Sequence, residues 1–352
     1  EDVKAYFSLG ACMEGVSQLA SCLFGLKFVA NAVLPGETWH EDVIKVDIED
    51  AEGRQVGTVY CDFLEREGKP SQDCHYTIRG GRVINQGPQK GQYQSPIVCI
   101  QLNLTRATDS PPLLLFDEVE NLFHEWGHAL HSMLARTRYQ HVTGTRCSTD
   151  LAEIPSTLFE SFALHPKVVP HYARHWKTGE PLKDAEQVFE RIRLLRGFGQ
   201  SLEISQQAVH SLLDQQLHST EPLPAPSNEM LHKIQSEFLQ SWFNPALGTA
   251  WTHRFGHLSG YGARYYSYLM ARAAANLILR RLGLDKDPWC SSAGHKLKQE
   301  LLQYGGELPP KYALSRLLNM PEHDFQPEVQ LADALVEDLA EKEDMAHTLL
   351  TS

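Results

Sequence analysis

Several features that would assign a protein class at once are missing from this sequence. Its seven cysteines are odd in number and widely spaced, and no C-x-x-C pair occurs among them. That pattern argues against a disulfide framework or a thiolate zinc knuckle and favours a reducing compartment. No apolar run approaches the roughly 18 residues that a membrane span needs. We therefore expect no insertion into a membrane.

Long blocks of one charge sign are also missing. The formal net charge is −12, and phosphate binding needs clustered lysine and arginine, so we expect no nucleic-acid partner. Hydrophobic residues make up 42% and charged residues 22% of the chain, a mixture that supports a sizeable core. The chain opens at Glu1 without a methionine, a signal peptide or an Arg-rich transit segment. We interpret it as a processed or truncated piece.

The hydrophobic periodicity predicts a mostly helical α+β fold, with a small antiparallel sheet placed before a long helical part. We treat residues 1–352 as one domain, in which 1–110 form a helix and the sheet and 111–352 are helical. Expected strands are 43–48, 56–63 and 97–102, with a short one near Tyr76 in a loop-like stretch, 64–94. Expected helices are 3–30, 117–136, 150–164, 184–217, 227–243, 262–282, 292–304 and 329–349.

One short segment points to metal chemistry. His124-Glu125-Trp126-Gly127-His128 has the H-E-x-x-H pattern within a predicted helix. Residues i and i+4 share a helix face, so both imidazoles can reach one ion, while Glu125 lies about 100° round the helix. In this pattern the glutamate approaches the water on the metal. With 17 histidines in the chain, a chance match has a probability of roughly 5%, so a third ligand is needed.

Glu153 is the candidate third ligand. Catalytic zinc of this kind takes two histidines and one glutamate and leaves a position for water. Glu153 follows His128 by 25 residues (153 − 128 = 25). The residues at 148–150 could cap a helix there, and Pro155 suits a first helical turn. The pattern thus predicts a second helix that brings a carboxylate to the first.

Two further carboxylates lie near this ligand in sequence. Glu160 follows Glu153 by two helical turns and shares its face. Asp150 and Glu160 are therefore candidate acceptors for the free N–H groups of the ligand histidines. The alternatives are a helix cap for Asp150 and a solvated helix residue for Glu160.

The segment 255–268 combines glycines with a histidine and four tyrosines. Tyrosine hydroxyls and an imidazole can donate hydrogen bonds to a developing oxyanion. The alternative is an aromatic helix face next to a turn. The Gly260-Tyr261-Gly262 run is no dinucleotide fingerprint, because the third glycine is absent and no strand clearly precedes it.

These motifs together resemble the thimet oligopeptidase family of metallopeptidases over nearly the whole chain. The shared features are D-E-V-E at 117–120 before H-E-W-G-H, Glu153 in an A-E-x-P-S setting, and the His-Gly-Tyr segment. The resemblance implies that one zinc ion is bound by His124, His128 and Glu153. It implies that Glu125 is the general base. It further implies substrate binding by His257, Tyr261, Tyr265 and Tyr268, with catalytic hydrogen bonds from Tyr268 and from Tyr261 or His257.

The resemblance also implies a zincin-type catalytic domain within a helical ellipsoid, split by a deep channel that admits only unfolded peptides. Family members are much longer, and the part absent here is their N-terminal half, which supplies much of the opposite channel wall. Segments 138–146 and 259–262 are most similar to the branch that processes imported mitochondrial precursors.

We therefore expect a monomeric zinc endopeptidase of the mitochondrial matrix. It would act on unfolded precursor N-termini and remove an octapeptide after a first processing cut. The alternative is a general oligopeptidase that degrades short peptides. A zinc-retaining binding protein is a third possibility, and the intact Glu125 counts against it.

Overall fold

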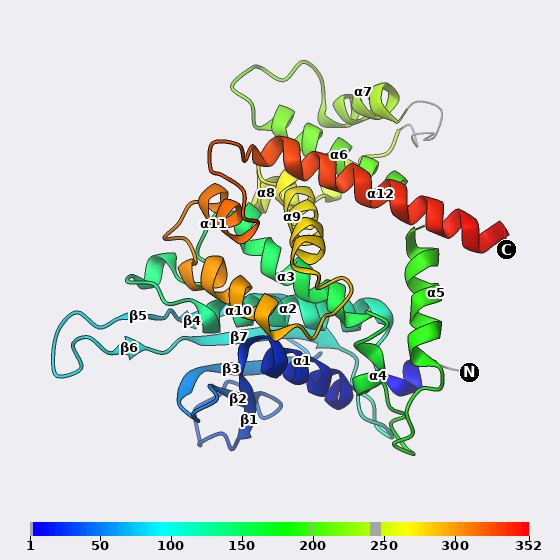
Figure 1. Cartoon of the computed structure of the whole chain (residues 1–352). Helices are drawn as coiled ribbons and strands as arrows, with labels where there is room; N and C mark the ends of the chain where they lie inside the picture. The colour runs from blue at the N-terminus through cyan, green and yellow to red at the C-terminus, as the bar shows by residue number, and fades with distance from the viewer. Residues whose placement is uncertain (1–2, 198, 240–247, 352) are drawn as a thin grey trace.

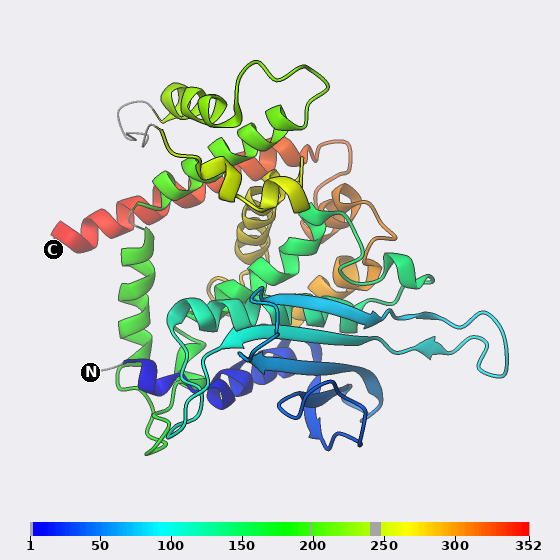
Figure 2. The ribbon, with the colours of Figure 1, turned by 180° about the vertical axis from the view of Figure 1, so that it is seen from behind.

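A small sheet lies at one end of the molecule, and helices stack away from one of its faces (Figures 1 and 2). This computed structural model describes residues 3–197, 199–239 and 248–351. The mostly helical α+β fold predicted from the sequence is confirmed. No helix in the described ranges is both long and apolar enough to cross a membrane.

The strands form two sheets. The larger sheet has the order β1-β2-β3-β7-β4. A two-stranded arm, β5 with β6, projects from it in Figure 1. The strands are β1 (Lys27–Asn31), β2 (Ile44–Glu49), β3 (Gln55–Leu64), β4 (Cys74–Arg79), β5 (Arg82–Val83), β6 (Tyr93–Gln94) and β7 (Ile97–Leu104).

Helices make up the other regular secondary structure of the described chain. The longer ones are α1 (Leu9–Phe24), α2 (Phe116–Leu134), α3 (Thr149–Ala163), α5 (Ala185–Gly197), α6 (Gln200–Leu217), α7 (Ser227–Phe238), α9 (Tyr266–Leu282), α10 (Ser291–Glu300), α11 (Pro310–Leu317) and α12 (Pro327–Thr351). Single turns are α4 (Val169–Tyr172), α8 (His257–Gly260) and the 3-10 turns η1 (Val3–Tyr6), η2 (Gln140–Val142), η4 (Trp251–Arg254) and η5 (Leu302–Tyr304).

The larger sheet is mixed, which corrects the expected antiparallel sheet. β3 and β7 run parallel, with Thr58 opposite Ile97, while the other neighbouring strands are antiparallel. The reason is topological: β4 pairs with β7 and not with β3. β7 therefore enters between them and runs opposite to β4, which makes it parallel to β3.

Glycines account for two boundaries that the sequence prediction missed. The expected helix 3–30 is in fact η1, α1 and β1, because Gly25 ends α1 in the left-handed conformation with φ +68°. The expected helix 184–217 is split into α5 and α6, and Gly199 precedes α6 with φ +78°. The predicted end of helix 227–243 partly lies outside the described residues, since the structure describes α7 only to Phe238.

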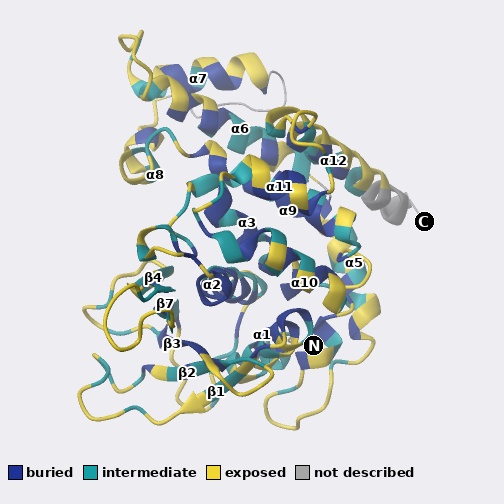
Figure 3. Ribbon diagram, turned by 60° about the vertical axis from the view of Figure 1, so that its left-hand side comes forward, coloured by how far each residue is buried: buried dark blue, intermediate teal, exposed yellow. Residues whose placement is uncertain are grey.

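The core is built around α2, which lies between the sheet and α3 (Figure 3). Trp126 is fully buried. Its ring stacks on Phe28 of β1 with centroids 4.6 Å apart, and its indole N–H donates to the sulfur of Met13 on α1 at 3.2 Å. Trp126, the first variable position of the H-E-x-x-H motif, thus anchors the motif to the core.

A buried ion pair closes the end of the parallel strand pair. Asp62 on β3 accepts hydrogen bonds from Arg66 at 2.6 and 2.8 Å and from the indole of Trp39 at 2.8 Å. The ammonium of Lys69, 1% exposed, lies 3.0 Å from the same carboxylate and also donates to a carbonyl of Leu102 on β7. Burial alone would raise the pKa of Asp62, but these donors lower it to about 2.

We predict that Asp62→Asn lowers the free energy of unfolding by about 3 kcal/mol, because Lys69 stays buried without a carboxylate. Urea denaturation measures the loss. Asp62 contributes stability above its ordinary pKa of 3.8 and loses it as pH falls through about 2. The difference in unfolding free energy between the parent and Asp62→Asn should therefore shrink as the pH falls from 3.8 to about 2.

The matched control is Glu190→Gln, which removes a half-exposed pair with Arg193. Its cost should stay below about 1 kcal/mol. An Asp62→Asn cost no larger than the control's would contradict the stabilising role of the buried pair.

Candidate metal centre and catalytic site

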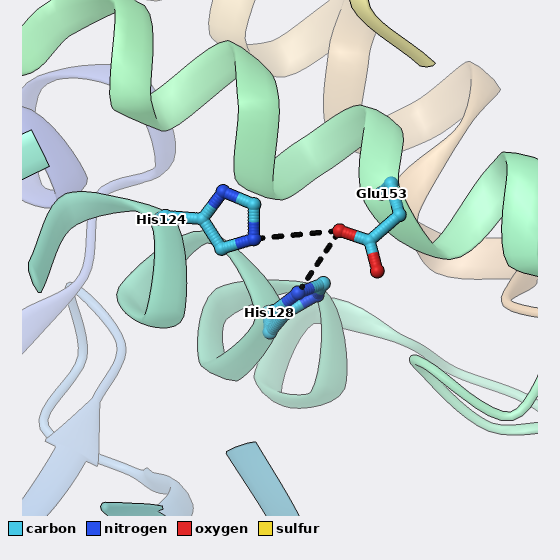
Figure 4. Close-up of side chains that lie close together, drawn as sticks. All are labelled: His124, His128 and Glu153. Carbon is cyan, nitrogen blue, oxygen red and sulfur yellow. Dashed lines mark ion pairs between the residues drawn. The ribbon is translucent and has the colours of Figure 1, made fainter. Parts of the chain in front are cut away.

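Two helices bring the predicted metal ligands together. His124 and His128 lie on α2 and Glu153 lies on α3, and one ligand atom from each falls within 4.8 Å of the other two. Oε2 of Glu153 is 3.3 Å from Nε2 of His124 and 3.4 Å from Nε2 of His128 (Figure 4). Ligands held tetrahedrally at about 2.0–2.2 Å from zinc lie about 3.3 Å apart. This donor set and spacing fit a zinc ion.

The close approach of α2 and α3 depends on Gly127. A Cβ atom at Gly127 would lie 2.6 Å from Cα of Ser156 and 2.7 Å from the carbonyl oxygen of Pro155. Both are backbone atoms, so α3 would have to move. Pro155 lies in the helix interior and not in the first turn as predicted, because α3 begins at Thr149.

Ser156 is a site residue that the sequence analysis missed. It is fully buried, and its hydroxyl oxygen lies 3.1 Å from Oε2 of Glu153 and 2.9 Å from the carbonyl oxygen of the same residue. A hydroxyl in this place restrains the ligand carboxylate. The available signal was a serine three positions after the ligand on one helix face.

Glu160 lies where the prediction for an acceptor requires it. Its Oε2 is 2.9 Å from Nδ1 of His124, the nitrogen that faces away from Glu153. Burial alone would lower the pKa of His124, but hydrogen bonds with Glu153 and Glu160 raise it to about 10. Glu160 thus holds the His124 ring with Nε2 toward Glu153.

The prediction for Asp150 needs correction. Its Oδ1 accepts from the backbone N–H of Leu151 at 3.1 Å, in the first turn of α3. No hydrogen bond joins Asp150 to a ligand histidine in the described ranges, where Nδ1 of His128 is buried without a partner. The cap alternative does not hold either, because Ser148 is the N-cap of α3. Asp150 lies in the first turn, where its carboxylate accepts from a free N–H of its own helix.

Glu125 has the environment of a general base. The residue is 6% exposed, and Oε2 has no hydrogen-bond partner among the described residues. Burial raises the pKa of Glu125 although His128 and His124 act in the opposite direction. A carboxylate with a raised pKa beside the ligands can take up a proton from water and give it back.

Two neutral histidines lie near His128. His131 is fully buried on α2, and burial followed by the charge of His128 lowers its pKa to about 3. The ring of His75 on β4 is centred 6.0 Å from that of His128, and burial again lowers its pKa to about 3. Both imidazoles are thus uncharged at neutral pH. The sequence analysis missed them, although His131 is one turn after His128.

The predicted histidine and tyrosines form one aromatic cluster. The ring of His257 is centred 5.9 Å from Tyr261 and 5.7 Å from Tyr268. Burial, and next the charge of Glu153, raise the pKa of Tyr268. Burial raises the pKa of Tyr261 as well, with contributions from Cys74, Glu153 and Glu125. Both hydroxyls therefore feel the charge of the ligand carboxylate.

Tyr265 is placed differently from the prediction of a substrate contact. It is 8% exposed, and its hydroxyl donates to Oε1 of Gln207 on α6 at 2.5 Å. Its ring packs edge-on against Phe255, with centroids 4.9 Å apart. Tyr265 thus supports the segment from within, because its polar end is already bonded to a helix.

We predict that Gly127→Ala weakens zinc binding at least about tenfold, since displaced α3 carries Glu153 away from the histidines. It should also destabilise the fold by about 1–3 kcal/mol through overpacking. Competition with a chromogenic chelator gives the affinity, and thermal denaturation gives the stability.

Gly10→Ala is the control, since nothing lies within 4 Å of a Cβ atom at this position of α1. It should keep the parent's zinc affinity and gain slight stability. Parent-like zinc binding by Gly127→Ala would show that the helix contact does not set the ligand geometry.

Comparison with known proteins gives one consistent result. The family model for Peptidase family M3 matches residues 1–326. Mitochondrial intermediate peptidase of Homo sapiens is 44% identical over 336 residues, which are 95% of this chain and 45% of that protein. The Arabidopsis thaliana protein of that name is 38% identical over 316 residues, covering 90% of this chain and 44% of its own length. The chain thus spans about half the length of the curated relatives it matches.

Solved structures show a similar fold at low sequence identity. PZ peptidase A has a TM-score of 0.50 at 15% identity, with 81% of this chain and 44% of that chain covered. A structure described as an oligoendopeptidase F has a TM-score of 0.52 at 14% identity, with 81% and 43% covered. With a family model over residues 1–326 and relatives that align along most of its length, the chain belongs to Peptidase family M3.

Proposed function

We propose that this chain is the catalytic part of a zinc metalloendopeptidase. The observation that carries the proposal is the convergence of His124, His128 and Glu153 within 4.8 Å, beside the buried carboxylate of Glu125. Two imidazoles and one carboxylate are a ligand set of catalytic zinc that leaves a position for water.

The proposed mechanism draws on four side chains, of which Tyr261 and His257 are alternatives for one role. A zinc ion in this site supplies a Lewis acid that makes water a nucleophile near neutral pH. Glu125 takes the proton from the attacking water and passes it to the leaving amine. The hydroxyl of Tyr268, together with Tyr261 or His257, donates hydrogen bonds to the oxyanion that develops on the scissile carbonyl.

We propose the substrate and location by analogy with the curated relatives. Their names describe mitochondrial intermediate peptidases, which supports a mitochondrial location, and within the mitochondrion we propose the matrix. There the enzyme would remove an N-terminal octapeptide from imported precursors after the first processing cut. Its substrates would be unfolded segments, and we propose that it acts as a monomer.

We predict that Glu125→Gln keeps about one zinc per chain and loses hydrolysis of a quenched fluorescent peptide by at least about a hundredfold. The amide fills the same space but cannot accept the proton. Metal analysis and fluorescence give the two quantities on the same samples.

Retained turnover in Glu125→Gln would remove this residue from the mechanism. Absence of zinc from both proteins would refute the metal site itself. If both bind zinc and neither cleaves, the site stands, and adding the N-terminal half of a relative tests whether the opposite wall completes the enzyme.

A general oligopeptidase would share every catalytic residue, so substrate profiling separates the two activities. Cleavage of a precursor after its octapeptide supports the processing role. Indifferent cleavage of short peptides supports the alternative.

We predict that Tyr268→Phe lowers kcat about a hundredfold, equivalent to about 3 kcal/mol, with zinc content unchanged, because one oxyanion donor is lost. Tyr266→Phe is the control, since Tyr266 is 41% exposed at the start of α9. Its activity should match the parent's. Equal rates for both variants would exclude Tyr268 as a donor.

A further inference from the structure

The turn between the two proposed oxyanion donors is held by a helix that carries no catalytic residue. Tyr261 and Tyr268 lie on either side of residues 262–265. Two of these four residues, Ala263 and Tyr265, are hydrogen-bonded to α6 through its side chains Gln207, Asp214 and Gln215. The helix thus supports the turn from one side.

Asp214 makes the central contact. Its residue is fully buried, and Oδ1 accepts from the backbone N–H of Ala263 at 3.0 Å while Oδ2 accepts from that of Tyr265 at 2.9 Å. Nδ1 of His218, one turn later on the chain, lies 3.0 Å from Oδ1. A buried carboxylate is costly unless donors satisfy it. Here two of its three donors are backbone groups of the turn.

The backbone of Ala263 is strained without this support. Its φ is +61°, in the left-handed region that residues with a Cβ atom rarely adopt. Both polar groups of its backbone are bonded to α6, the N–H to Asp214 and the carbonyl oxygen to the side-chain amide of Gln215 at 3.0 Å. A strained conformation persists only where its surroundings fix it.

The neighbouring glycine lets the turn lie flat on the helix. A Cβ atom at Gly262 would come within 2.3 Å of Nε2 of His218. Any side chain at this position would force either the ring or the turn to shift. Gly262 and His218 thus bring the backbone close enough for Asp214 to reach it.

The upstream end of the segment rests on the same part of the molecule. Trp251 stacks on His210 of α6 with ring centroids 4.5 Å apart. The hydroxyl of Thr252 lies 2.9 Å from that of Ser227 at the start of α7. Both ends of the segment that bears His257 and Tyr261 are therefore attached to α6 and α7.

We infer that Asp214 is a positioning residue, which fixes the turn 262–265 and thereby aims Tyr261 and Tyr268 at the substrate. This inference rests on the proposed function for its consequence in catalysis. The anchoring itself concerns hydrogen bonds within the chain and is testable without turnover.

Amide hydrogen exchange followed by mass spectrometry tests the anchor in the zinc-loaded protein. In Asp214→Asn one acceptor oxygen becomes a donor that opposes a backbone N–H. Exchange in the peptide covering 261–268 should accelerate at least about tenfold, whereas α2 peptides keep the parent's rates. Gln215→Ala, an exposed substitution that removes only the carbonyl partner, should give a smaller change in the same peptide.

Asp338→Asn is the matched control. Asp338 is a buried aspartate on α12 that accepts from Asn276 and Arg280 of α9, far along that helix from the turn. Unchanged exchange at 261–268 in both Asp214→Asn and Gln215→Ala would overturn the anchor. So would acceleration equal to that of Asp338→Asn, because the effect would then be general destabilisation.

The catalytic consequence is measured separately. With zinc content equal to the parent's, kcat/KM of Asp214→Asn should fall at least about tenfold while that of Asp338→Asn is unchanged. Faster exchange with unchanged kcat/KM would overturn the positioning role.

If the parent chain shows no turnover, that result bears on the proposed function and leaves the anchoring by Asp214 untouched. The same comparison is then made by fluorescence anisotropy with a dye-labelled unstructured peptide. Asp214→Asn should bind it at least about tenfold more weakly than Asp338→Asn does, and equal affinity would overturn the positioning role.

Discussion

The contact between α2 and α3 at Gly127 is the constraint on which the metal site depends. Two ligands are fixed on α2 by the helical repeat, but the third comes from another helix and needs close approach of two backbones. The missing side chain of Gly127 permits that approach, and Trp126 beside it holds α2 in the core. Ser156 and Glu160 then restrain Glu153 and His124 from α3. The two variable positions of the motif thus support the structure differently: Trp126 holds α2 in the core, and Gly127 lets α3 approach.

The charges around the site are arranged so that one proton or one cation fits between the ligands. Glu153 and Glu160 place negative charge on both sides of the His124 ring. His75 and His131 stay neutral because they are buried, so they add no positive charge next to His128. Glu125 keeps its proton more readily than an exposed glutamate would. The two carboxylates that contact His124 thus favour a positive charge at the site, either a proton or a divalent cation.

The sequence predicted part of the candidate metal site because two of its side-chain pairs are related locally. His124 and His128 are related by one helical turn, and Glu160 lies two turns from Glu153 on one face. Asp150 could not be assigned the same way, because a helix terminus and an imidazole compete for the same short side chain. The parallel pairing of β3 with β7 could not be predicted either, because it depends on whether β4 pairs with β7 or with β3. Tyr265 and Asp214 owe their roles to contacts between α6 and the turn before α9 that no local pattern encodes.

The candidate metal ligands and the segment with His257 and Tyr261 are built on separate cores in the described part of the chain. The metal ligands lie on α2 and α3 in the main core, whereas Val209 and Leu213 of α6 pack with Met230, Leu231 and Ile234 of α7 in a small core of their own. The segment that bears His257 and Tyr261 is attached to this small core. Substitutions there can move His257 and Tyr261 and leave the spacing of His124, His128 and Glu153 intact. Selection can therefore act on metal affinity and on the placement of the proposed oxyanion donors through different sets of residues.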